Sequence, residues 1–99
     1  MEYKAEVLEK AVDSHGSMNQ TIKAAEELSE LLVALNNWLG MSENEDYIRD
    51  NIREECADVE IMLSQLKILF GDWSDWKHYK LDRLEERINA INGTTENAC

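Results

Sequence analysis

Proline is absent from this sequence of 99 residues, and only four of its residues are glycine. Proline and glycine mark most turns and helix breaks, so their scarcity leaves few places where a helix would be interrupted. Leu, Glu, Lys, Ala and Met are abundant and favour helices, and no segment between turn signals reads as a β-strand. The sequence therefore predicts an all-α protein.

Basic residues are scarce: ten Lys and Arg stand against 21 Asp and Glu, which gives a net charge of −11. A surface of that sign repels phosphate groups, so we expect no binding of a nucleic acid polymer through a basic face. A small anionic substrate is compatible with this charge only if cations accompany it into the site.

Long apolar runs and a cysteine framework are missing as well. No apolar run approaches the roughly 18 residues of a membrane span, and the first residues, MEYKAEVLEK, contain no apolar signal segment, so we expect neither a membrane protein nor classical export. Cys56 and Cys99 do not suggest a disulfide scaffold, and we expect two reduced thiols, with Cys56 on the apolar face of a helix. These features predict a cytoplasmic protein, located in the host cytoplasm if a phage encodes it.

Breaks and capping residues divide the chain into four predicted helices, over about residues 2–14, 17 or 19–39, 42–70 and 72 or 74–91. The first ends at Gly16, which suits a left-handed cap, and the third begins at a capping box formed by Ser42 and Glu45. Asn92 and Gly93 close the fourth helix. We expect one domain over residues 1–93, followed by a short, frayed polar tail over residues 94–99.

The helical period is clearest in the second and third helices, where apolar residues recur every three or four positions. The predicted core residues are Ala24, Leu28, Leu31, Leu35 and Leu39 in the second helix, and Ile52, Cys56, Val59, Leu63, Leu66 and Phe70 in the third. A short connection should make these two helices an antiparallel hairpin. The first and fourth helices, or a second subunit, must cover the remaining apolar side. Because so short a chain buries little surface alone, we expect the fold to be completed in a homodimer or a homotetramer.

Two acidic pairs, Glu27 with Glu30 and Glu55 with Asp58, occupy matching places on the two hairpin helices. At about 100° per residue, Glu27 and Glu55 fall at the border of the apolar arcs, and their partners fall about 60° further out. Other pairs of acidic residues three positions apart also occur in this sequence and are expected on the solvated surface. The two pairs on the hairpin helices differ from them because both lie at the same angle from the apolar arc of their helix. Four converging carboxylates repel unless hard divalent cations neutralise them, and all-oxygen ligation is typical of Mg²⁺ or Mn²⁺. The sequence therefore predicts these four residues as metal ligands.

The segment KAAEELSELLVAL carries Glu26, Glu27 and Glu30, and the segment EECADVEIML carries Glu55 and Asp58. Together they resemble the EExxE and ExxD motifs of the MazG-like all-α NTP pyrophosphohydrolases. The resemblance extends through YKLDRLEERI, which is similar to the C-terminal Lys-x-x-Arg helix of that family, and it covers about residues 17–90. Small phage and bacterial members are closest in size.

The resemblance implies Mg²⁺-dependent hydrolysis of a (d)NTP at the α-phosphorus, which releases a nucleoside monophosphate and pyrophosphate. It implies that Glu27, Glu30, Glu55 and Asp58 are the catalytic metal ligands, with Mn²⁺ as a substitute ion. Either Glu27 or Glu30 would be the general base. Glu26 would be an accessory carboxylate.

The same resemblance implies that Lys80 and Arg83 contact the triphosphate. The chain departs from the family pattern here. Many members have an Asn shortly before this Lys and two adjacent Arg residues, whereas Tyr79 precedes Lys80 and Leu84 follows Arg83.

Other polar and aromatic residues have two readings each. Lys23 is either an ion-pair partner of the acid one turn later or a contact to the phosphate or the base of a nucleotide. Gln20 either reads a base edge or is a buried or interface amide. Trp38, Trp73 and Trp76 either stack on a nucleobase or anchor helix ends by packing.

Two other functions compete with the enzyme. The net charge of −11 also suits a non-enzymatic acidic helical interaction protein or a DNA mimic, although such a protein has no need of Glu55 beside an apolar stripe. The third reading is a structural bundle with incidental acid pairs. Saturable Mg²⁺ or Mn²⁺ binding that a Glu55→Gln variant loses would favour the enzyme over both.

Overall fold

The computed structural model describes residues 5–40 and 44–97, and its regular structure is entirely α-helical in these ranges. The described helices are α1 (Ala5–His15), α2 (Ser17–Leu39), α3 (Glu45–Phe70) and α4 (Ser74–Asn97). The prediction of an all-α chain with four helices is thereby confirmed for these residues. None of the described helices is long and apolar enough to cross a membrane.

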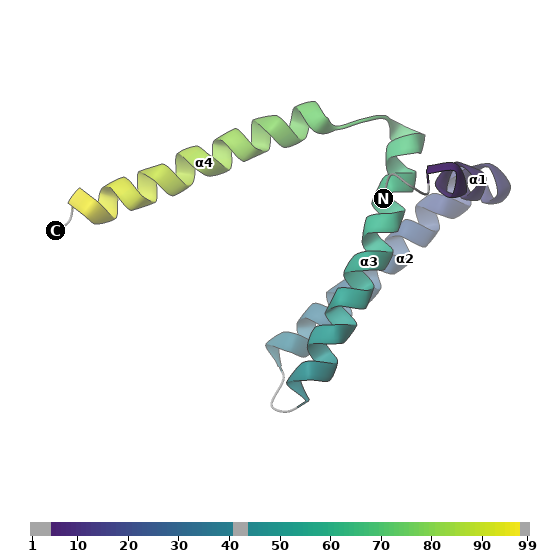
Figure 1. Ribbon diagram of the computed structural model, residues 1–99, viewed down its shortest axis with the longest axis horizontal. Coiled ribbons are helices and arrows are strands. Elements are labelled where there is room, and N and C mark those ends of the chain that lie inside the picture. The colour runs from purple at the N-terminus through teal and green to yellow at the C-terminus, as the bar shows by residue number, and fades with distance from the viewer. Residues whose placement is uncertain (1–4, 41–43, 98–99) are drawn as a thin grey trace.

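α2 and α3 lie side by side as an antiparallel hairpin, and α1 packs against both helices at the end where α2 begins and α3 ends (Figure 1). α4 instead leaves the end of α3 and extends away from the other three helices (Figure 1). Within the described residues it makes no packing contact with α1, α2 or α3. Of the two predicted ways to cover the hairpin, packing of the chain's own fourth helix is therefore not observed among the described residues, which leaves a second subunit as the alternative.

The hairpin helices meet on a different face from the one that the apolar period predicts. The buried residues of the two helices are small or polar on α2 (Gln20, Ala24, Glu27 and Ala34) and include the apolar Val59 and Met62 beside Gln65 on α3. By contrast, Leu28, Leu35 and Leu63 are 47%, 42% and 40% exposed. Small side chains let two helix axes approach closely, and both helices are rotated so that their acidic sides face each other.

Correspondingly, only part of the predicted core is buried. Ala24 and Val59 are buried, whereas Leu39 and Phe70 are 81% and 72% exposed. The predicted burial of Cys56 is wrong, because its thiol is free and its side chain exposed. Leu31, Ile52 and Leu66 are half-buried. Cys99 lies outside the described residues.

The start of α3 differs from the predicted capping box. α3 begins at Glu45, directly after Asn44, which has a left-handed backbone with φ of 60° and no side-chain capping hydrogen bond. The Glu45 carboxylate instead accepts a hydrogen bond of 2.8 Å from Arg49, one turn later. Ser42 lies outside the described residues.

The helix boundaries show that a glycine interrupts the helices at Gly16 but not at Gly93. Gly16 has the predicted positive φ of 84°, but its ψ of 156° lies outside the left-handed helical region and leads directly into α2. α4 begins at Ser74, whose N–H donates to Asp72 Oδ1 at 2.6 Å. The predicted end of α4 near Ile91 is wrong, because the helix continues through Gly93 to Asn97. An interior glycine costs a helix only about 0.5–1 kcal/mol, which is too little to stop it.

Candidate metal centre

Four carboxylates meet at the contact between α2 and α3: Glu27 and Glu30 from α2, and Glu55 and Asp58 from α3. Each offers one oxygen, and the four oxygens lie within 4.8 Å of one another. Residues three apart share one face of a helix, so each helix presents two acids to its neighbour. The expected convergence of these side chains is therefore present.

Two of the carboxylates each have one buried oxygen that lacks a hydrogen-bond partner. Glu27 is only 7% exposed, and Glu27 Oε2 and Glu55 Oε2 are both buried with no hydrogen bond. Lys23 Nζ lies 3.1 Å from the other oxygen, Glu27 Oε1, and is the one cation paired with this cluster in the described chain. Buried charged groups are costly unless paired. The two orphaned oxygens are thus free to take a cation as a partner.

Electrostatics within the cluster act most clearly on Glu55. Desolvation by burial raises the pKa of its carboxyl, and the negative charges of Glu30 and Asp58 raise it further. A raised pKa means that the folded protein holds this proton more tightly than the unfolded chain does. Ionisation of Glu55 therefore lowers the stability of the ion-free protein as the pH rises through that pKa.

We expect a Glu55→Gln variant to unfold at a higher temperature than the wild-type protein when divalent cations are chelated. The substitution removes one mutually repelling charge, so the midpoint should rise by a few degrees near pH 7. The gain should disappear below about pH 4, where the carboxyl is protonated in both folded and unfolded chains. Thermal unfolding followed by circular dichroism in EDTA measures this. Glu54→Gln, at the exposed neighbouring residue, is the control, and an equal gain there would contradict the local explanation.

The donor set matches a hard divalent cation. All four groups are carboxylates, and no His or Cys joins them among the described residues. Oxygen ligation of this kind suits Mg²⁺ or Mn²⁺ rather than zinc or copper. The cluster could therefore hold the predicted metal, and its orphaned oxygens fit that use.

A cavity of about 670 Å³ adjoins one side of the cluster, between α1 and the hairpin. Glu27 and Asp58 line it together with Gln20, Lys23 and Glu26. The proposed accessory acid Glu26 thus faces the cavity as an exposed residue and does not join the four-carboxylate cluster. The volume lies within the usual range for small-molecule sites, about 300–1,000 Å³.

Lys80 and Arg83 lie on α4 and not at the carboxylate cluster. Both are exposed residues of α4, and neither lines the cavity beside the carboxylates. Arg83 places its guanidinium 5.7 Å from the centre of the Tyr79 ring, and Lys80 lines a separate groove of about 430 Å³ along α4. The single chain therefore does not bring these two residues to the metal centre.

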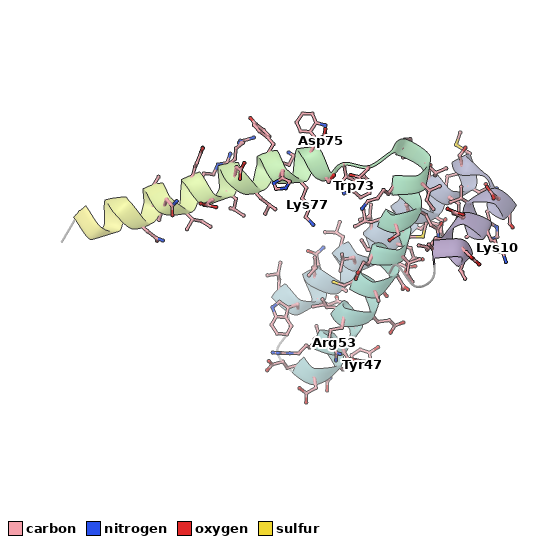
Figure 2. All side chains as sticks on the ribbon, turned by 45° about the horizontal axis from the view of Figure 1, so that its top comes forward. Lys10, Tyr47, Arg53, Trp73, Asp75 and Lys77 are labelled. Carbon is pink, nitrogen blue, oxygen red and sulfur yellow. The ribbon has the colours of Figure 1, made fainter. Side chains whose placement is uncertain are left out.

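The three tryptophans also lie outside the cavity. Trp38 stacks under the Arg49 guanidinium at 5.4 Å, and Trp73 under Lys67 Nζ at 5.1 Å. Trp76 meets Tyr79 edge to face at 6.2 Å. Figure 2 shows Trp73 where the chain passes from α3 to α4. These contacts favour packing over base stacking within one chain.

Two residues near the centre were missed by the sequence reasoning. Gln65 is buried and lines the large cavity, and Asn51 lines a hollow of about 290 Å³ beside Glu30 and Glu55. Gln65 was detectable in principle, because it is a polar residue inside an apolar run and follows Asp58 by seven positions. That spacing places it two turns along the acidic face of α3.

Comparisons with known proteins identify no relative: no protein-family model, no curated protein and no solved structure matches this chain. The functional reading therefore depends on the motifs and on the geometry of the site.

Proposed function

We propose that this protein is a Mg²⁺-dependent nucleoside triphosphate pyrophosphohydrolase of the MazG-like all-α type. The observation that carries the proposal is the meeting of four carboxylates from two helices, two of them with a buried oxygen that lacks a partner. The order of the EExxE and ExxD motifs along the chain and the adjoining cavity support it.

In this proposal Glu27, Glu30, Glu55 and Asp58 hold Mg²⁺, or Mn²⁺ in its place. When bound, these ions offset the charge of the triphosphate and acidify water in the site. The oxygen of water forms a bond to the α-phosphorus, and the bond from that phosphorus to the oxygen of the leaving pyrophosphate breaks. Glu27 or Glu30 accepts the proton that the water loses. The products are a nucleoside monophosphate and pyrophosphate.

Positive side chains must help the site accept so anionic a substrate. Lys23 lines the cavity. Its ammonium group pairs with the Glu27 carboxylate, and the hydrogen bond and the negative charge of Glu27 raise the pKa of Lys23. It is thus a charged group at the place where a triphosphate would enter. Lys80 and Arg83 are the further phosphate contacts that the proposal requires, and a second copy of the chain is their source.

The apolar surface of α4 supports this assembly. Leu81, Leu84, Ile88 and Ile91 follow one another at intervals of three and four, and they are 51%, 50%, 47% and 65% exposed. An exposed stripe with this spacing is typical of a helix that packs against another helix. The hairpin presents a matching exposed surface, formed by Leu28, Leu32, Leu35 and Leu63.

Charge supports the same pairing. Lys77, Lys80, Arg83 and Arg87 follow one another at intervals of three and four along α4, and Lys80, Arg83 and Arg87 lie on one flank of its apolar stripe. Figure 2 shows Lys77 projecting from α4 on the side of the hairpin. The hairpin carries the cluster of four carboxylates. In a homodimer, α4 of one subunit would cover the hairpin of the other and carry Lys80 and Arg83 to its site, and a homotetramer could repeat the same contact.

Titration calorimetry with Mg²⁺ and with Mn²⁺ tests the metal centre directly. We expect saturable binding to the wild-type protein and at least about a tenfold loss of affinity in Glu55→Gln, since that variant removes a charged ligand. Glu54→Gln makes the same chemical change one residue away and should bind as the wild type does. Circular dichroism confirms that each variant is folded. Absence of binding to the wild-type protein would refute the proposal and favour an acidic interaction protein or DNA mimic.

A further inference from the structure

Two buried glutamines connect α2 and α3 beside the metal centre. Gln20 is 6% exposed and Gln65 is 5% exposed, and Gln20 Nε2 donates a hydrogen bond to Gln65 Oε1. Glutamine is mostly an exposed residue, and burial of an amide is costly unless its groups are bonded. A pair of apolar side chains would join the helices without that cost, so packing alone does not account for this pair.

The bond between the glutamines leaves half of their polar groups unused. An amide offers one oxygen acceptor and one NH₂ donor, so Gln20 Oε1 and Gln65 Nε2 take no part in it. Among the described residues, the buried side-chain nitrogen and oxygen atoms without a hydrogen bond belong to Glu27 and Glu55. The two free amide atoms of the glutamines are not among them, so they remain accessible to solvent. Both glutamines line the cavity. The cavity wall therefore carries a donor beside an acceptor, and it would still do so if both amides were turned over.

The position of the pair relative to the carboxylates is also specific. Gln20 precedes Glu27 by seven residues on α2, and Gln65 follows Asp58 by seven residues on α3. Because the helices are antiparallel, both glutamines lie on the same side of the acidic cluster, about 10 Å along the helices from it. That distance is comparable with the length of a nucleoside. A triphosphate held at Glu27 and Asp58 would therefore place its nucleoside end near the amides.

We propose that the cavity between α1 and the hairpin binds the nucleoside of the substrate, and that Gln20 and Gln65 bond to the edge of its base. This inference rests on the proposed function. Every natural base presents a hydrogen-bond donor next to an acceptor on its pairing edge, which is the complement of what the amides offer. Gln20 and Gln65 are thus binding residues for the base, and the ligand class is a nucleoside triphosphate rather than a simple polyphosphate.

Calorimetry with ligands that the protein cannot cleave tests this inference. The probes are α,β-imido analogues of the nucleoside triphosphates and inorganic tripolyphosphate, each titrated with Mg²⁺ present. We expect at least one nucleotide analogue to bind the wild-type protein about tenfold or more tightly than tripolyphosphate. The Gln20→Met/Gln65→Met double variant should lose that advantage and keep its affinity for Mg²⁺ and for tripolyphosphate.

The double variant is chosen because removal of both hydrogen-bonding partners leaves no orphaned buried amide, so the helices should stay packed. Gln65→Met alone, checked by circular dichroism, provides a second test with the same expected loss. The inference fails if the double variant keeps the wild-type advantage for nucleotides, or if tripolyphosphate binds the wild type as tightly as every analogue. If Mg²⁺ and tripolyphosphate bind but the base adds nothing, the metal centre stands and only this inference falls. If the wild-type protein binds no Mg²⁺, both proposals fall.

Discussion

An Asp58→Asn variant is expected to release pyrophosphate from nucleoside triphosphates about 10³-fold more slowly than the wild-type protein, with unchanged helix content. Asp58 is half-buried, contributes one of the four meeting oxygens and also lines the cavity, so its charge bears on both metal and substrate. Loss of a ligand that helps to neutralise a transferring phosphoryl group commonly removes several powers of ten in rate. Glu27→Gln should have a similar effect, because Glu27 is the most deeply buried of the four acids.

A panel of canonical and modified (d)NTPs with Mg²⁺ and a coupled pyrophosphatase measures this rate and identifies the preferred base. Glu60→Gln is the matched control, since Glu60 is an exposed acid of α3 two residues from Asp58, and it should retain wild-type turnover. Near wild-type turnover in Asp58→Asn would show that the cluster is not the catalytic site.

Mixing two inactive variants is expected to restore activity if α4 acts in the partner subunit. One variant carries Asp58→Asn, and the other carries Lys80→Ala and Arg83→Ala, which should lower turnover by about 10²-fold or more. In a mixed dimer, the intact carboxylates of one subunit would meet the intact α4 of the other, giving one working site out of two. With random pairing after co-refolding, half of the dimers are mixed, so about one quarter of wild-type activity should return.

The arrangement of α4 makes this outcome informative. No described part of α4 packs against its own hairpin, so Lys80 and Arg83 have no route to the carboxylates of the same chain in this conformation. Each variant refolded alone is the control and should remain inactive. If the mixture gains nothing over its parents, the phosphate contacts are made within one subunit or are absent.

Local rules of sequence account for most of the helical framework. Gly40 and Gly71 follow the ends of α2 and α3 as predicted, because a break between strong helix formers is a local property. α4 shows the limit of such rules, since Gly93 is only a weak break and the helix continues past it. The start of α3 shows another, because Glu45 pairs with Arg49 rather than with a capping residue.

The spacing of the apolar residues alone does not determine on which faces α2 and α3 meet. The leucines mark an arc centred beside the acids, whereas the observed contact is centred on Glu27 and Met62. Burial of the leucines requires a third partner surface, and a prediction from one chain cannot weigh a surface that another chain would supply. The four carboxylates were predictable because their spacing fixes their face on each helix. Gln65 was not recognised, since its role emerges only when α3 is placed against Gln20.

If α4, which extends away from its own hairpin, packs in the proposed homodimer, dilution should lower the activity of this protein. In that dimer the exposed apolar residues of α4 would be covered by another molecule, so the dimer population would follow the law of mass action. Specific activity would then rise with the amount of chain present, and a cell that makes little of it would hold mostly inactive monomers. Expression level would in this way set a threshold for function without any added regulator.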